Sequence, residues 1–334
     1  MTEHPGENGP TVLQHWRGLP TALFILAPPR SFTSLMCAMI GQHPQMYGLP
    51  ETHLLCFQTM AERAAYESQT TYPMGHGLLR AVAQLYFRAQ TEASVRKAKL
   101  WLEQRSDLTT EFLFSVLLDR VFPRIAVDKS PSMVSPETMK RIYKNFPHAC
   151  FIHLLRHPRG HAESVVRYIH LREKQGPLPP THWLIRISSH PAPVGHHNGS
   201  SEGAPLDPQY GWYAYNKSIS DFLKTVPAAQ RLTVRGEELL GDTDDVLSDI
   251  AGWMGLRINE EAIDRMKHPE RSPYAFLGPR GARYGNDIFF LENPRLRPSR
   301  ASEALSLEGP LGWRKDGQEF CPEVKQMARD FGYE

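Results

Sequence analysis

The sequence has few cysteines, no long apolar run and almost no excess charge. Its four cysteines are widely spaced in 334 residues, and three lie in apolar runs, so we expect neither disulfides nor a zinc site. A formal net charge of +2 argues against a general nucleic-acid binder. No window has the apolar length of a membrane span, and residues 1–20 are polar, without a signal peptide's apolar core. We therefore expect a cytoplasmic protein that binds neither membranes nor nucleic acids.

A Walker A motif is also absent, because the glycines and the Lys-Ser/Thr end of that motif are missing. The sequence nevertheless has a strand, a loop and a helix near its N-terminus. Residues 22–27 form a short apolar run typical of a buried strand, Pro28 and Pro29 make a turn, and residues 35–40 suit a buried helix ending near Gly41. The loop between them holds one guanidinium and three hydroxyl groups, from Arg30, Ser31, Thr33 and Ser34.

This loop has two interpretations. The amides and the dipole at the helix N-terminus, together with the hydroxyl groups, would hold a phosphate. Alternatively, the segment from Ser31 to Ser34 only caps the helix, and Arg30 is only a surface residue after a turn. Short patterns of this kind also occur by chance, so the loop alone does not decide between the two.

A second stretch favours the phosphate interpretation. Residues 149–155 are another strand-like run, and Arg156 stands at its carboxyl end, where open α/β sheets bind ligands. Ser164 follows eight residues later, about two turns into a helix that should begin near Pro158. Since a guanidinium can bind a phosphate through two hydrogen bonds, one ligand could contact both loops.

Together these two motifs resemble those of the sulfotransferases that use 3′-phosphoadenosine 5′-phosphosulfate (PAPS). Residues 28–34 are similar to their 5′-phosphosulfate loop, and Arg156 with Ser164 is similar to their 3′-phosphate motif. One position departs from the family pattern, because Phe32 stands where the loop usually has a glycine.

Three further segments extend the resemblance, which spans Thr21 to about Leu256. Residues 48–53 resemble a glutamate-bearing segment of the tyrosylprotein-type and related bacterial sulfotransferases, and residues 128–131 resemble their lysine segment. Residues 234–256 resemble their late strand and the helix after it.

The resemblance implies a role for each matched residue. Arg30 and Lys129 would supply positive charge to the sulfonyl group, and Arg156 and Ser164 would hold the 3′-phosphate. The 5′ end of PAPS would lie on the segment Ser31, Phe32, Thr33 and Ser34. Glu51 would be the catalytic base, with His53, expected to start the next helix, as the alternative. No metal is implied.

The rest of the chain predicts an α/β protein, with a P-loop-like three-layer fold around a parallel sheet. Apolar residues recur at helical spacing in residues 54–66, 77–90 and 109–122, which should form a helical cap. Further strands are expected at 124–127 and 232–235, and further helices at 135–145, 158–173, 210–223 and 322–331. Residues 174–207 are rich in Pro, Gly and Ser, which is typical of a loop or lid, and residues 268–312 should form irregular substrate loops. Arg280, Arg283 and the later segment Trp313 to Lys315 could meet phosphate, but a solvated side chain is the favoured interpretation of each. We expect one domain over residues 1–334.

Two other functions stay open. Asp128 after a strand could imitate the magnesium-binding aspartate of a P-loop-like kinase, although the Walker A lysine is missing. The second alternative function is that of a non-catalytic binding protein with the PAPS fold. The presence of both Glu51 and Lys129 argues against it. The acceptor, a small molecule or a carrier-linked group with a hydroxyl or amine, and the oligomeric state are left open.

Overall fold

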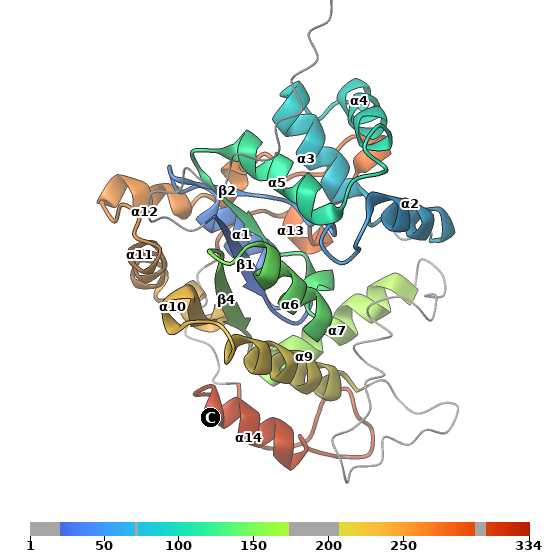
Figure 1. The fold of residues 1–334 in the computed structure, drawn as a ribbon. Helices are drawn as coiled ribbons and strands as arrows, with labels where there is room; N and C mark the ends of the chain where they lie inside the picture. The colour runs from blue at the N-terminus through green and yellow to red at the C-terminus, as the bar shows by residue number, and fades with distance from the viewer. Residues whose placement is uncertain (1–20, 71–72, 174–206, 298–304) are drawn as a thin grey trace, which may run out of the picture.

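The computed structural model describes residues 21–70, 73–173, 207–297 and 305–334. At its centre is a parallel five-stranded sheet in the order β2-β3-β1-β4-β5 (Figure 1). The strands are β1 Ala22–Leu26, β2 Met46–Gly48, β3 Ile125–Asp128, β4 Cys150–Leu155 and β5 Arg231–Arg235. The prediction of a P-loop-like α/β fold is confirmed.

The central strand β1 is buried on both faces. Its residues alternate between two apolar clusters, so that Phe24 and Leu26 face one helical layer while Leu23 and Ile25 face the other. The ring of Phe24 stacks on Phe151 of β4, with ring centroids 5.6 Å apart. This two-sided burial explains the continuous apolar run in the sequence.

Helices cover both faces of the sheet and extend beyond one of its edges (Figure 1). The face toward Leu23 packs on α1 Thr33–Ile40, α10 Gly236–Gly241, α11 Thr243–Trp253 and α12 Glu260–Met266. The other cluster contains residues of α3 His76–Phe87, α4 Glu92–Glu103, α5 Thr110–Val121, α6 Pro136–Asn145 and α9 Pro208–Leu223. The other α-helices of the described residues are α2 Met60–Gln69, α7 Pro158–Glu173, α13 Ile288–Glu292 and α14 Pro322–Asp330.

The strand register aligns the carboxyl ends of the middle strands. Phe24 of β1 lies opposite Asp128 of β3 and Phe151 of β4. The loops that follow β1, β3 and β4 therefore leave the sheet at one edge, which is the edge where the sequence places Arg30, Lys129 and Arg156.

Most predicted elements are confirmed, and one boundary is wrong. Helix α7 has the predicted limits, and Ser135 caps α6 as expected. The helix expected from Leu54 begins only at Met60, so the prediction that His53 starts a helix is wrong. Leu54 is buried as a loop residue, and Thr59 forms the capping box that starts α2.

The sequence did not predict β2, α4, α12 or α13, and two predicted regions cannot be compared. Strand β2 has only three residues, and α4 lies in a polar stretch. Residues 1–20 and most of the expected lid, 174–206, lie outside the described residues. In the part of the chain that is described, no helix has the length and apolarity needed to cross a bilayer.

The cap contacts the sheet edge through a glycine. A Cβ atom at Gly77, in the first turn of α3, would lie 1.8 Å from the carbonyl oxygen of Glu51. Only a residue without a side chain permits this approach of the helix to the loop after β2.

We predict that Gly77→Ala lowers the free energy of unfolding by about 2 kcal/mol, because the added methyl group forces the helix away from residue 51. Gly252→Ala in α11 is the matched control. Its Cβ would meet no described atom within 4 Å, so it should raise the free energy by up to ~1 kcal/mol through helix propensity. Urea denaturation measures both, and equal stabilities of Gly77→Ala and wild type would contradict the close packing.

Candidate active site

The loop after β1 keeps its shape despite lacking a glycine. Phe32 has φ 60°, in the left-handed region that a glycine adopts readily, at a cost of roughly 1–2 kcal/mol for other residues. Its ring points away from the loop, against Gly236, where an added Cβ would lie 2.3 Å from the ring. The guanidinium of Arg156 lies 4.3 Å from the ring centroid. The ring is thus packed, and the backbone takes the conformation expected of the usual glycine.

The hydroxyl groups of this loop do not cap the helix. Phe32 is the N-cap residue of α1, and no side-chain hydrogen bond to the cap is found in the described chain. Ser31 is fully buried, and its Oγ has no hydrogen-bond partner among the described residues. The interpretation that residues 31–34 only cap a helix is therefore wrong, and the N-terminal end of α1 is available to an anion.

Lys129 connects the loops after β1 and β2. It is 1% exposed, and its Nζ lies 2.5 Å from Oε1 of Glu51 and 2.7 Å from Oγ of Ser34. Because a buried ammonium must be paired, these contacts hold the three segments at fixed positions.

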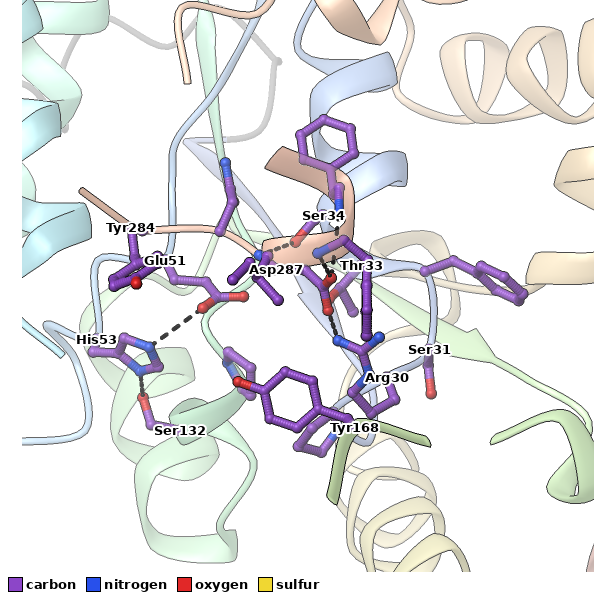
Figure 2. A pocket seen from close by; sticks show the side chains of 18 of the residues that line it. Arg30, Ser31, Thr33, Ser34, Glu51, His53, Ser132, Tyr168, Tyr284 and Asp287 are labelled. Carbon is purple, nitrogen blue, oxygen red and sulfur yellow. Dashed lines mark hydrogen bonds and ion pairs between the residues drawn. The ribbon is translucent and has the colours of Figure 1, made fainter. Parts of the chain in front are cut away.

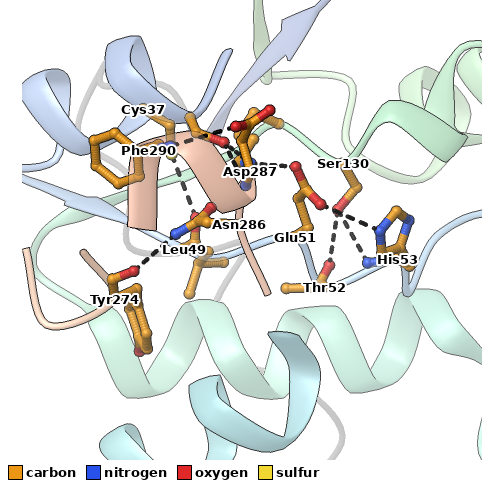
Figure 3. Close-up of polar contacts among 12 residues, drawn as sticks. Cys37, Leu49, Glu51, Thr52, His53, Ser130, Tyr274, Asn286, Asp287 and Phe290 are labelled. Atoms are coloured by element: carbon orange, nitrogen blue, oxygen red, sulfur yellow. Dashed lines mark hydrogen bonds and ion pairs between the residues drawn. The ribbon is translucent and has the colours of Figure 1, made fainter. Parts of the chain in front are cut away.

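Asp128 forms hydrogen bonds to the loops after β2 and β3. Its carboxylate accepts hydrogen bonds from Oγ1 of Thr52, at 2.7 Å, and from both the backbone N and Oγ of Ser130, at 2.9 and 2.8 Å. Ser130 Oγ also accepts a hydrogen bond from the backbone N of His53 (Figure 3). Asp128 thus positions the residues around the cavity and is not the partner of Lys129.

Glu51 and His53 point toward each other in the cavity (Figure 2). Nε2 of His53 lies 3.6 Å from Oε2 of Glu51, and its Nδ1 lies 2.8 Å from Oγ of Ser132. Burial alone would raise the pKa of Glu51, but Lys129 and then His53 outweigh it and lower this pKa from 4.5 to about 2. The carboxylate is therefore ionised, and its pairing with Lys129 makes it a weak base in this state.

The second predicted motif lies against the first. Nη1 of Arg156 donates to the carbonyl oxygen of Arg30 at 2.6 Å, and Nε of Arg30 donates to Oγ of Ser164 at 3.3 Å. Burial lowers the pKa of Arg156 to about 10, which leaves it charged at neutral pH. Its Nε is buried without a hydrogen-bond partner in the described segments. One ligand could therefore reach both motifs.

A cavity of about 770 Å³ opens over these loops. Arg30, Glu51, His53 and Arg156 line it, whereas Lys129 and Ser164 are buried beside it. Its other walls come from α2, α6, α7 and residues 284–297. Residues of these walls that the sequence did not indicate are Ser132, Tyr168, Arg172, Tyr284, Asp287, Phe289, Arg295 and Arg297.

The arginines of the C-terminal region that line the cavity, Arg295 and Arg297, are not those that the sequence indicated. Arg314 pairs with Asp207 and Asp316, and Trp313 donates to Asp207. Neither these two residues nor Arg280 and Arg283 line the cavity, which favours the interpretation that they do not contact phosphate. The arginine-rich composition indicated the region but not which residues face the cavity. Within the described ranges, no group of three or more His, Cys, Asp or Glu side chains is arranged to hold a metal ion.

We predict that the pair of Lys129 and Glu51 makes stability depend on acidity. The pKa of Glu51 is lowered on folding, so its contribution is complete above about pH 4.5 and is lost as the pH falls toward about 2. Glu51→Gln should be less stable than wild type by about 2 kcal/mol at pH 7, since it leaves a buried ammonium without a carboxylate. This difference should shrink by pH 2.5.

Glu103→Gln, at an exposed carboxylate of α4, is the control and should change stability little at either pH. Urea denaturation at pH 7 and pH 2.5 measures the three proteins. A difference between Glu51→Gln and wild type that stays constant with pH would contradict the pairing.

Comparison with known proteins supports the sequence resemblance. Residues 20–183 match the model of the sulfotransferase family. No curated protein gives a significant match. The sulfotransferase domain from the curacin biosynthetic pathway is 22% identical, with a TM-score of 0.71, over 95% of this chain and 99% of that domain. The sulfotransferase domain of the Synechococcus PCC 7002 olefin synthase is 24% identical, with a TM-score of 0.67, over 94% of each chain.

The two solved domains show a shared fold, and the family model matches the segment that contains Arg30, Glu51, Lys129, Arg156 and Ser164. Residues 20–183, just under half of this chain, thus match the sulfotransferase family, and the chain has the fold of the two solved sulfotransferase domains.

Proposed function

We propose that the protein transfers a sulfonyl group from PAPS to a hydroxyl group of an acceptor with an apolar body. The observation that carries this proposal is that Arg30, Ser34 and Glu51 line one cavity. Lys129 is buried beside this cavity and contacts both Ser34 and Glu51. Positive charge for a sulfonate and a carboxylate for the acceptor proton are what this reaction needs.

The donor site is supported by unsatisfied polar groups. Oγ of Ser31 and Nε of Arg156 are both buried without partners among the described residues, an arrangement that costs free energy unless a ligand binds them. Together with the uncapped start of α1, they suit the two anionic ends of PAPS. In this proposal Ser31, Thr33 and Ser34 bind the 5′ end, and Arg156 and Ser164 bind the 3′-phosphate.

The reaction forms a bond between the acceptor oxygen and sulfur and breaks the bond between sulfur and the bridging oxygen of PAPS. The leaving group is adenosine 3′,5′-bisphosphate, and the acceptor proton goes to the protein. Lys129 would neutralise the charge that develops on the departing side. Ser34 contacts Lys129 directly and would orient its ammonium group.

The pairing of Lys129 with Glu51 links donor binding to the strength of the base. Glu51 is a weak base while Lys129 lowers its pKa. A sulfonate that attracts the ammonium would weaken this pairing and raise the pKa of Glu51 toward the value of a useful base. His53, fixed by Ser132, lies close enough to receive the proton or to act as the base itself.

Part of the cavity wall is apolar. It includes Phe57, Tyr66, Met74, Val134 and Leu171. Such a wall would bury an alkyl or aryl body better than a carbohydrate, whose hydroxyl groups would lose hydrogen bonds to water. An alcohol on an apolar chain or ring is therefore the acceptor class that the site favours.

A kinase is the less favoured function. The aspartate that would have to hold magnesium, Asp128, is 1% exposed. Both of its oxygens already accept hydrogen bonds from Thr52 and Ser130. The side chain would have to give up these bonds to reach a metal–nucleotide complex.

Calorimetry with adenosine 3′,5′-bisphosphate tests the donor site. We predict that Arg156→Ala weakens binding at least ~10-fold, since a charged hydrogen bond contributes about 1.5 to 3 kcal/mol. Arg96→Ala, which removes an exposed arginine of α4 outside the cavity, is the control and should bind like wild type. Equal affinity of Arg156→Ala and wild type would contradict the assignment of Arg156 to the 3′-phosphate. A preference for ATP over PAPS would favour a kinase.

Turnover with PAPS separates the two candidate bases. We expect Glu51→Gln to lose ~100-fold or more in turnover while keeping its affinity for the nucleotide, and His53→Ala to lose much less. Glu51 is favoured because it matches the family's glutamate and is paired with Lys129. If the two losses came out in the reverse order in folded proteins, His53 would be the base and Glu51 would only orient it.

A further inference from the structure

An acidic side chain lies against the loop after β1, residues 28–34, which is called the donor loop below. The carboxylate of Asp287 forms an ion pair with the guanidinium of Arg30, and the two side chains point directly at each other in Figure 2. The backbone N of Asp287 donates to Oγ of Ser34 at 3.1 Å. Asp287 therefore contacts two of the groups that the proposed function assigns to the donor.

The guanidinium of Arg30 is held at this position by aromatic rings. Its Cζ lies 5.1 Å from the ring centroid of Tyr168 and 5.0 Å from that of Phe289. Burial lowers its pKa to about 10, so it stays charged at neutral pH. Because the cation is confined in this way, an anion that arrives at the loop must share it with Asp287 or replace it.

Asp287 pairs with a cation that would otherwise face the donor. Arg30 pairs with Asp287 and Lys129 pairs with Glu51, so each of these two cations has a carboxylate partner. The donor is strongly anionic, and a paired cation attracts it less than a free one. Displacing Asp287 would free the charge of Arg30 for the donor.

Helix α13, which carries Asp287 at its N-cap, is short. It has five residues, of which Phe290 and Leu291 are buried, and Phe290 packs in a cluster with Ala38 and Ala275. Gly285, just before it, has φ 116° and accepts a hydrogen bond from the backbone N of Glu51. Because Asp287 lies at the start of so short a helix, its carboxylate can leave Arg30 through a local movement.

We propose that Asp287 is an internal competitor of the donor, whose carboxylate occupies the place of the 5′ anionic group at Arg30 and must leave when the donor binds. The inference rests on the proposed function, since it names the donor as the displacing anion. The affinity for the donor is then reduced by the free energy that Asp287 gains from Arg30 and Ser34.

Nucleotides that differ only at the 5′ position test this proposal. Asp287→Asn removes the charge and keeps a side-chain oxygen to cap α13. In the wild type this oxygen accepts hydrogen bonds from the backbone N of Phe289 and Phe290. Asp287→Ser also keeps a capping oxygen and serves as a second variant. Calorimetry would measure adenosine 3′,5′-bisphosphate and adenosine 3′-phosphate, which has no 5′ anion.

We expect both variants to bind adenosine 3′,5′-bisphosphate about 10-fold more tightly than wild type and to bind adenosine 3′-phosphate with unchanged affinity. Glu292→Gln is the matched control, because it removes the same charge from the exposed C-terminal end of the same helix. It should change neither affinity.

Three results would overturn the proposal. Unchanged or weaker binding of the bisphosphate would give Asp287 a structural role only. An equal gain for both nucleotides, or the same gain in Glu292→Gln, would indicate a general effect of charge and not competition at Arg30. Failure of wild type and both variants to bind either nucleotide would overturn the proposed function together with this inference, whereas binding without the selective gain would overturn this inference alone.

Discussion

The buried ammonium group of Lys129 is the constraint on which the site depends. A charge at this depth is tolerated only with close partners, and the structure supplies a carboxylate from the loop after β2 and a hydroxyl from the start of α1. Asp128 fixes the same loops through Thr52 and Ser130. The positions of the catalytic candidates are thus set by the need to compensate one charge.

The requirement that buried charges be paired also links donor binding to the strength of the base in the proposed reaction. While Glu51 pairs with Lys129, the base is weak, and while Asp287 pairs with Arg30, the charge of Arg30 is already compensated. In our account the donor breaks both pairings, so that the site becomes reactive when the donor is present. This arrangement would keep the free protein stable without leaving buried charges unpaired.

Much of this site follows from the sequence because parallel strands end at one edge of a sheet. The runs 22–27 and 149–155 predicted strands, so Arg30 and Arg156 were expected to meet, and they do. Asp287 and Phe289 were not predicted. They lie in an irregular segment more than 250 residues from Arg30, held by contacts that leave no periodic pattern in the sequence. The helix start near Leu54 was wrong because apolar residues are also buried in loops.

The most direct test of the central claim is an analysis of the products formed by wild type. The protein would be incubated with PAPS, a chelator and a panel of alcohols with apolar chains or rings, and mass spectrometry would measure the products. We predict a sulfonated alcohol and an equal amount of adenosine 3′,5′-bisphosphate. Transfer of phosphate from ATP to an alcohol, with PAPS left unused, would contradict it.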